Sequence, residues 1–351
     1  VPVGAQQGNP IVNGTMEVWQ DGPTFVAADN IYTADQWNFD LSSTGAVTVS
    51  RSTNVPTVAQ AGVLFNYSLE VSVTTADATV DAADYALISQ PIEGYSFRHY
   101  AQRQFTLSFW VQSPKTGVHA VTFRNGGINR SYVREYTIAA VNAWEFKTIT
   151  VTASPSAGTW NYTNGTGLVV FFGLMCGTTN GTSTIGSWLS SAVLGSNNQV
   201  NVMDSAANFF RITGVKMELG PVATPIQFAP FEVELARSKR YFQKSFPYAI
   251  APAQNAGATG ALLWTSPFTG TTPMTIPIPL SPPIRVNGAS FTTYNPSAAN
   301  AQARNSTDAV DDSATSISQN NEDSALLTFT PNATNTIGDL HRVHWTVNAR
   351  L

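Results

Sequence analysis

Aromatic residues set among amides are the side chains of this sequence best suited to binding chemistry. Sugar rings stack on aromatic faces, while Asn, Gln and Arg side chains hydrogen-bond their hydroxyls. The turn Trp160-Asn-Tyr-Thr-Asn164 has this composition, and Arg124 and Tyr132 flank a Gly126-Gly127 turn together with Asn125 and Asn129. The predicted ligand-binding residues are therefore Trp110, Arg124, Tyr132, Trp160, Tyr162 and Trp188. Packing against a loop, a second domain or another subunit is the alternative for each of them.

Acidic residues are scattered, which argues against catalysis. Glycoside hydrolysis requires two carboxylates set across one bond, one of them with a raised pKa. The acids of the first part of the chain form no such pair in sequence: Glu70, Asp77, Asp81, Asp84, Glu93, Glu135, Glu145 and Glu218. No G-x-S-x-G or H-E-x-x-H motif occurs either. We therefore expect no catalytic residues and no enzyme activity.

Metal-binding patterns are equally weak. His341 and His344 are three residues apart on an expected strand, so their side chains point to opposite faces. Asp308, Asp311 and Asp312 could gather around calcium, but they lack the glycine and closing Glu of a known loop. A solvated loop is the simpler interpretation, and no cofactor is predicted. The single cysteine, Cys176, follows an apolar run and is expected to be a buried, unreactive thiol.

The elements that must position these residues are short strands. In Phe105–Val111, Phe105, Leu107, Phe109 and Val111 alternate onto one face, and Trp110 falls on the other. Residues 168–175 are apolar on both faces, which is typical of a central strand whose outer face is also covered. Further strands are expected at 68–73, 85–88, 119–123, 132–138, 144–152 and 210–219. This spacing indicates a jelly-roll β-sandwich over residues 1–225.

A helical connector is expected over residues 226–245, with the helix at Phe231–Phe242. Pro230 precedes it and two acids lie in its first turn. Leu235 and Phe242, with Phe231, would form its apolar stripe. Residues 246–351 are expected to form a second, smaller β domain. It has an edge strand at 276–280, where prolines alternate, a polar loop at 295–323, and strands at 325–329 and 340–347.

Low charge restricts the class of partner. Charged residues make up 11% of the 351 residues, against about 25% in typical soluble proteins, and the net charge is −4. No Lys/Arg run is present, so nucleic acid is not an expected partner. No stretch approaches the ~20 apolar residues of a membrane span, so no membrane insertion is expected. With so few charges, binding to a surface is expected to depend little on salt.

A set of short ordered motifs resembles one family of proteins. The motifs are IVNGTMEVWQ at 11–20, YTADQW at 32–37, SLEV at 68–71, ISQPIEG at 88–94, FTLSFWVQSPKTG at 105–117, FRITGVKMELG at 210–220 and ATPIQFAPFEVELARSKRYFQKS at 223–245. Together they look like phage tail and fibre proteins, and more loosely like the jelly-roll carbohydrate-binding modules of glycoside hydrolases. The resemblance covers residues 9–245 and implies a jelly-roll fold, a location on the virion surface outside the cell, and often a homotrimer. Jelly-roll modules often hold a structural calcium, so the resemblance keeps one possible.

The expected function combines the aromatic sites with this resemblance. We expect a virion structural or adhesin protein, such as a tail fibre, a head fibre or a similar appendage, that binds host-surface polysaccharide. Its other partners would be further virion proteins. A purely architectural capsid-decoration or fibre-base protein is the main alternative, and a polysaccharide depolymerase is the second.

Overall fold

The computed structural model describes residues 8–318 and 320–351, and these divide into two compact units. The N-terminal unit contains the described residues up to Trp19, Pro23–Phe231 and Leu351, and the C-terminal unit contains Gln20–Gly22 and Glu232–Arg350. Each unit is described by itself below.

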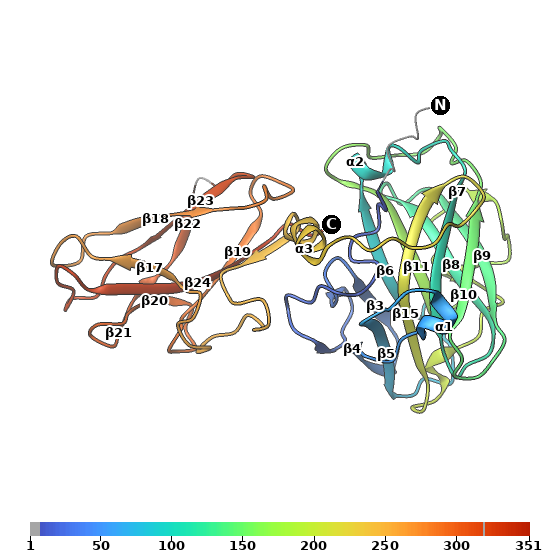
Figure 1. The fold of residues 1–351 in the computed structure, drawn as a ribbon, viewed down its shortest axis with the longest axis horizontal. Coiled ribbons are helices and arrows are strands. Elements are labelled where there is room, and N and C mark those ends of the chain that lie inside the picture. Colours follow the sequence, from blue (N-terminus) through green and yellow to red (C-terminus); the bar gives the residue numbers. More distant parts are fainter. Residues whose placement is uncertain (1–7, 319) are drawn as a thin grey trace. The chain divides into compact units, whose positions relative to one another are not determined.

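Two large sheets form the sandwich of the N-terminal unit (Figure 1), and a short parallel pair of two-residue strands lies beside them. One has the strand order β1 (Thr24–Val26), β4 (Ala46–Ser52), β5 (Ser68–Thr75), β15 (Phe209–Leu219), β7 (Phe105–Gln112) and β10 (Glu145–Val151). The other has the order β13 (Trp188–Leu189), β9 (Ser131–Ile138), β8 (Gly117–Asn125), β11 (Thr166–Cys176), β6 (Tyr85–Glu93), β3 (Asn38–Ser42) and β2 (Ile31–Tyr32). All ladders in both sheets are antiparallel. This all-β jelly-roll sandwich confirms the predicted fold class.

The alternation of side chains sets the core between the sheets. The inward residues of β7 are fully buried, while Trp110 remains partly exposed on the outer face. Strand β11 lies in the middle of its sheet and is buried on both faces, as its apolar run predicts. Part of its outer face is covered by the segment that carries β12 (Gly181–Thr182) and β14 (Gly195–Ser196), where Gln199 approaches Gly173.

Between the described strands of this unit lie three helices of a single turn. These are α1 (Val58–Ala61), α2 (Gly94–Phe97) and the 3₁₀ turn η1 (Val202–Asp204). A single turn is too short to show a helical period, although the Thr57 and Gln60 capping box at α1 is a local signal that we missed in the sequence. Helix α2 directly follows β6 at one end of the sandwich (Figure 1).

The C-terminal unit is a smaller β structure that follows the helix α3 (Phe231–Lys239). In one sheet, the long strand β24 (Leu340–Asn348) pairs with β16 (Phe242–Lys244) and β17 (Leu262–Thr265), and with β19 (Ser290–Tyr294) and β20 (Gln302–Asn305). Strand β20 in turn pairs with β21 (Val310–Ala314). The other sheet has the order β18 (Met274–Pro279), β23 (Ser324–Phe329) and β22 (Ser316–Ser318), so the proline-rich strand is an edge strand, as predicted.

Two expectations for the second half of the chain are wrong. The segment 295–323 is not a polar loop, because it contains β20, β21 and β22. In α3 the buried residues are Glu234 and Ser238, while Phe231 is exposed and Phe242 lies in β16, so the predicted apolar stripe does not form. Among the described residues, no helix is long and apolar enough to cross a bilayer.

Candidate functional site

Four of the six predicted binding residues meet at one end of the N-terminal sandwich. Trp160 and Tyr162 both stack on Phe97, with ring centroids 5.4 and 6.4 Å away and interplanar angles of 19° and 12°. Trp188 packs edge-on against Trp160, with ring centroids 5.6 Å apart, and in a tilted arrangement against Tyr132 at 5.3 Å. We call these five residues the loop-end cluster.

The loops of this cluster are fixed by the amides around the Gly126-Gly127 turn. The side-chain amide of Asn125 donates to Asn129 Oδ1 and to the carbonyl oxygen of Thr159, at 2.8 and 2.7 Å. Asn129 Nδ2 donates to Thr159 Oγ1 at 3.0 Å. A Cβ on Gly126 would lie 1.9 Å from the carbonyl oxygen of Thr166, so only glycine allows this approach. Asn125 and Asn129 thus position the loops and are not free ligand contacts.

The cluster presents ring surface to solvent and keeps its indole donors occupied. Trp160 Nε1 donates to the carbonyl oxygen of Ala157 at 3.1 Å, and Trp188 Nε1 donates to that of Thr152 at 3.0 Å. Tyr162 is 37% exposed, and Tyr95 from α2 is 44% exposed beside it, with its backbone N–H donating to the carbonyl oxygen of Thr163 at 2.7 Å. Ring faces on a rigid base suit stacking of an apolar ligand face.

Tyr132 is the one member whose predicted role is wrong. It is only 1% exposed, because it pairs with Trp188 on the core-facing side of β9 and packs into the sandwich core. It therefore supports the cluster from below and cannot touch a ligand. The sequence missed Tyr95 and Phe97, because aromatic residues just after a strand cannot be told from core residues by their pattern.

Arg124 lies on the opposite face of the same sheet. Its guanidinium carbon is 4.8 Å from the centroid of Phe171, and Nε is buried without a hydrogen-bond partner among the described residues. Nearby, Ser89 Oγ donates to Asp40 Oδ2 at 2.7 Å. These side chains, with Tyr85, form what we call the sheet-face cluster.

Burial sets the electrostatics of the sheet-face cluster. It raises the pKa of Asp40, with the hydrogen bond from Ser89 opposing the rise. It also lowers the pKa of Arg124, against the attraction of Asp40 and Tyr85, and raises the pKa of Tyr85. A buried, unpaired guanidinium nitrogen next to a carboxylate marks a place for ordered water or for ligand hydroxyls.

Trp110 belongs to a third surface, the outer face of the six-stranded sheet. It packs on Phe146 at 5.3 Å, and Phe65 packs on Phe228 at 5.3 Å. Gly214 lies between the two pairs, where a Cβ would be 2.8 Å from Phe65 and 3.2 Å from Trp110. Phe146 and Phe228 are 46% and 40% exposed. We call these four aromatic residues the Trp110 patch.

The carboxylates and histidines are engaged with neighbouring side chains. His341 Nδ1 bonds Asp312 and its Nε2 bonds Asn335, whereas His344 bonds Ser245 and stacks on Phe246, which confirms that the two imidazoles face apart. The calcium candidates Asp308, Asp311 and Asp312 do not converge, because each bonds to different side chains. Asp308 accepts from Asn305 and Thr334. Asp311 accepts from Arg304 and two asparagines, and Asp312 bonds to Asn332 and His341. No group of three or more His, Cys, Asp or Glu is placed to hold a metal ion in residues 8–318 and 320–351.

The acids considered for catalysis are similarly held. Glu70 pairs with Arg211, Glu145 with Lys147 and Glu218 with Lys216. Cys176 is only partly buried, yet burial raises the pKa of its thiol to about 12, so it is protonated at neutral pH.

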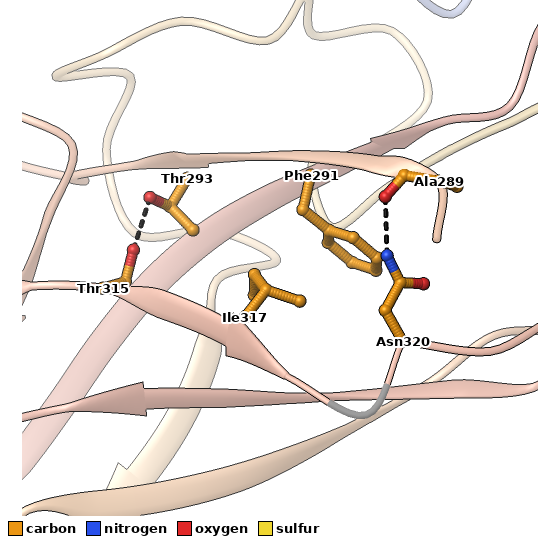
Figure 2. A pocket seen from close by; sticks show the side chains of 6 residues that line it. All are labelled: Ala289, Phe291, Thr293, Thr315, Ile317 and Asn320. Carbon is orange, nitrogen blue, oxygen red and sulfur yellow. Dashed lines mark hydrogen bonds between the residues drawn. The ribbon is translucent and has the colours of Figure 1, made fainter. Parts of the chain in front are cut away.

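A pocket of about 340 Å³ lies in the C-terminal unit between β19 and β22. Figure 2 shows Phe291 and Ile317 in its middle, with a hydrogen bond at each end. Thr293 and Thr315 share a hydrogen bond of 2.6 Å, and Asn320 Nδ2 donates to the carbonyl oxygen of Ala289 at 2.6 Å. None of the predicted binding residues lies here and no charged side chain lines it, so the pocket is an opening between strands of two different sheets, with a hydrogen bond at each end.

Among known proteins, the matches to this chain are solved structures. No protein-family model matches the sequence, and no curated protein matches it. A family 4 carbohydrate-binding module is 12% identical, covering 59% of this chain and 98% of the module, with a TM-score of 0.31. A family 61 module in complex with β-1,4-galactotriose is 13% identical, covering 61% of this chain and 99% of the module, with a TM-score of 0.30.

A third match has the same character. The family 11 module from Clostridium thermocellum, in complex with a β-1,3-1,4-mixed-linked tetrasaccharide, is 11% identical, covering 58% of this chain and 99% of the module, with a TM-score of 0.30. All three are carbohydrate-binding modules, and none of the three is a phage tail or fibre protein. Likeness at this level transfers neither a ligand nor a site residue to this chain.

Proposed function

We propose that this protein binds glycans through the loop-end cluster. The observation that supports the proposal is the shared stacking of Trp160 and Tyr162 on Phe97, which holds two aromatic rings rigidly at a surface. Tyr95 adds a further exposed ring from a different loop. Rigid aromatic faces lose little entropy on binding and complement the apolar face of a sugar ring.

We place this binding protein on the surface of a bacterial virus. The support is the order of short sequence motifs between residues 9 and 245, which resembles phage tail and fibre proteins. As a homotrimeric appendage, such as a tail or head fibre, it would display several copies of one weak site. Repeated weak contacts give high overall avidity through effective concentration, so no single site must bind tightly.

One observation favours the architectural alternative. The Trp110 patch exposes Phe146 and Phe228 on the outer side of the six-stranded sheet, each packed against a second aromatic ring. Exposed aromatic residues of this kind are enriched at subunit interfaces. The patch could bury itself between copies or against another virion protein, and in that role it would require no glycan.

The experiment that tests the proposal is a glycan array with the purified full chain and two matched variants. Tyr162→Ala is expected to weaken binding about tenfold, whereas Phe146→Ala, which removes a similarly exposed ring from the Trp110 patch, should leave it unchanged. Absence of binding by the folded wild-type protein would remove the proposal, and so would equal loss in the two variants. Light scattering measures the trimer, and release of reducing ends from a bound polysaccharide would establish a depolymerase instead.

A further inference from the structure

Three arginines on segments that adjoin the loop-end cluster have no acidic partner. Arg98 and Arg103 follow α2, and Arg130 follows the Gly126-Gly127 turn. None of the three forms an ion pair with a residue that the structure describes. Arg103 Nη1 reaches only the carbonyl oxygen of His99, at 3.5 Å.

Two of these arginines touch the aromatic platform itself. The guanidinium carbon of Arg98 lies 5.6 Å from the centroid of Tyr95, a cation–π arrangement that keeps the charge beside the exposed ring. Arg130 Nε donates to the carbonyl oxygen of Ala157 at 3.1 Å, the same atom that accepts from Trp160. Arg130 Nη1 donates to the carbonyl oxygen of Asn129 at 2.6 Å, which leaves its Nη2 amino group without a described partner.

Elsewhere in the N-terminal unit, positive charges are often neutralised. Each of its three lysines has a carboxylate partner, in the pairs Lys115–Asp204, Lys147–Glu145 and Lys216–Glu218. Arg211 is paired with Glu70. Arg51, Arg124 and Arg134 form no ion pair with a described residue either, so the loop end is distinguished by the contacts of Arg98 and Arg130 with the exposed aromatic platform. These contacts place two positive charges beside the rings in a chain whose net charge is −4.

Few described acidic residues lie near this charge. Glu93, the residue before α2, is buried, and Glu218 is paired with Lys216. Asp81 and Asp84 precede the start of β6, while Arg98 follows its end. Nine residues of strand span about 30 Å, several times the ~8 Å over which exposed charges act at physiological salt.

We infer that the glycan bound at the loop-end cluster is acidic, with carboxylate or phosphate groups along its chain. The inference rests on the proposed glycan-binding function and specifies its ligand class. Sugar rings stack on Tyr95, Trp160 and Tyr162, and the anionic groups accept hydrogen bonds from Arg98 and Arg130. The planar guanidinium fork matches both carboxylate and phosphate geometry. Binding would then depend on salt concentration, contrary to the expectation from the low overall charge, because the two arginines lie directly at the binding site.

The test compares one polymer in two forms. Binding of the full chain is measured for a polyuronate, for the same polymer after reduction of its carboxyl groups to alcohols, and for a phosphodiester-linked glycan. We expect the reduced polymer to bind about tenfold more weakly than the polyuronate, because it lacks the charges that the arginines attract. Binding of the polyuronate should also weaken several-fold between about 50 and about 200 mM salt, because salt screens exposed charges. A preference between the two acidic polymers identifies which anionic group is recognised.

Substitutions of the two arginines show whether they act through their charge or by supporting the fold. The double variant Arg98→Gln/Arg130→Gln should lose the preference for the acidic polymer and bind the reduced polymer as the wild type does. Arg98→Lys/Arg130→Lys should keep the salt dependence. Arg51→Gln is the matched control, because Arg51 also lies over a tyrosine ring, at 4.6 Å from Tyr67, but in the other sheet.

The outcomes distinguish the two proposals. Equal affinity for the acidic and reduced polymers, with no effect of the double glutamine variant, would overturn the acidic ligand while glycan binding stands. Loss of binding to the reduced polymer in the double variant would show that the arginines hold the fold, and would also overturn it. Absence of binding to every polymer would overturn both.

Discussion

Arg130 and Trp160 donate hydrogen bonds to the same acceptor, the carbonyl oxygen of Ala157, each at 3.1 Å. The two residues lie 30 positions apart in sequence, on two different loops. A shared acceptor fixes the distance between the cation and the indole, so neither side chain can move without disturbing the other. The relationship places a positive charge beside an aromatic face before any ligand arrives, which lowers the entropic cost of binding.

Asn125 should be the main support of this arrangement. It is fully buried, donates two side-chain hydrogen bonds and accepts two more, from the backbone N–H groups of Asn129 and Arg130. Asn125→Ala leaves several of these groups unpaired, so we expect a loss of about 3 kcal/mol in the free energy of unfolding. Urea denaturation measures it, with Asn66→Ala, an exposed amide bonded to Glu17, as a control expected within about 0.5 kcal/mol of wild type.

Gly214 should tolerate no side chain. Its φ of +64° favours glycine, and a Cβ there would be 2.8 Å from Phe65. We expect Gly214→Ala to cost about 2 kcal/mol or more, from backbone strain and overpacking together. In Gly8→Ala the added Cβ meets nothing within 4 Å, so that control should be nearly neutral in thermal denaturation. Equal melting temperatures for the two variants would contradict the tight contact.

His119 should make the protein sensitive to acid. It is fully buried, with Nε2 at 2.9 Å from the carbonyl oxygen of Lys115 and Nδ1 without a described partner, and burial lowers its pKa from 6.5 to about 4. The unfolded chain therefore binds a proton below pH ~6.5 that the folded protein does not bind until pH ~4. This difference should remove up to about 3 kcal/mol of stability as the pH falls through that window.

The measurement is urea unfolding at a series of pH values between 7 and 4. His119→Phe should reduce the slope of the stability curve over this range, leaving the contribution of His344, whose pKa is also lowered by burial. His99→Gln, at an exposed position, is the matched histidine substitution for comparison. A wild-type curve that is flat between pH 6.5 and 4 would show that His119 is not responsible for acid sensitivity.

Asp312 should be essential to the C-terminal unit. Its side chain is fully buried, accepts from His341 at 2.7 Å, and accepts from both the backbone and the side-chain nitrogen of Asn332 at 3.0 Å. Asp312→Ala leaves one buried donor, on His341, and two half-buried donors, on Asn332, unpaired, so we expect a loss of about 3 kcal/mol. The exposed Asp323→Asn is the control, and calorimetry that shows no change for Asp312→Ala would disprove the role.

Cys176 should react slowly in the folded protein. Since burial raises the pKa of its thiol to about 12, the thiolate population at pH 8 is very small. Labelling with a thiol reagent is expected to be at least tenfold slower in the native protein than in urea, by the size of this shift. Equal rates in the two conditions would indicate an accessible, activated thiol.

Much of the N-terminal fold could be predicted because its strands alternate. Phe105, Leu107 and Phe109 face the core in the way a two-residue period requires, and β11 is buried on both faces as its continuous apolar run indicates. The composition of Trp160-Asn-Tyr also pointed to the loop-end cluster. Tyr95 and Phe97 had no such signal, because only the tertiary fold brings α2 against the loop at 160.

The C-terminal unit was harder to predict because its buried positions are partly polar. Asn305 and Asp312 are buried in β20 and β21, and both are satisfied by side-chain hydrogen bonds. A polar residue in a strand looks like a loop residue in sequence, since its partner is unknown. The same difficulty applies to Arg124, which the sequence places beside the Gly126-Gly127 turn, because its neighbours Asp40 and Ser89 come from strands that are distant in sequence.

Strand β21 continues into β22 with only Thr315 between them, yet the first pairs with β20 and the second with β23. The two sheets of the C-terminal unit are therefore joined by a single extended piece of chain. Neither sheet can open alone without breaking the ladder of the other, so the unit should melt as one cooperative block. Amide hydrogens of β20 and of β23, in separate sheets, should then exchange with the solvent at a common rate set by global opening.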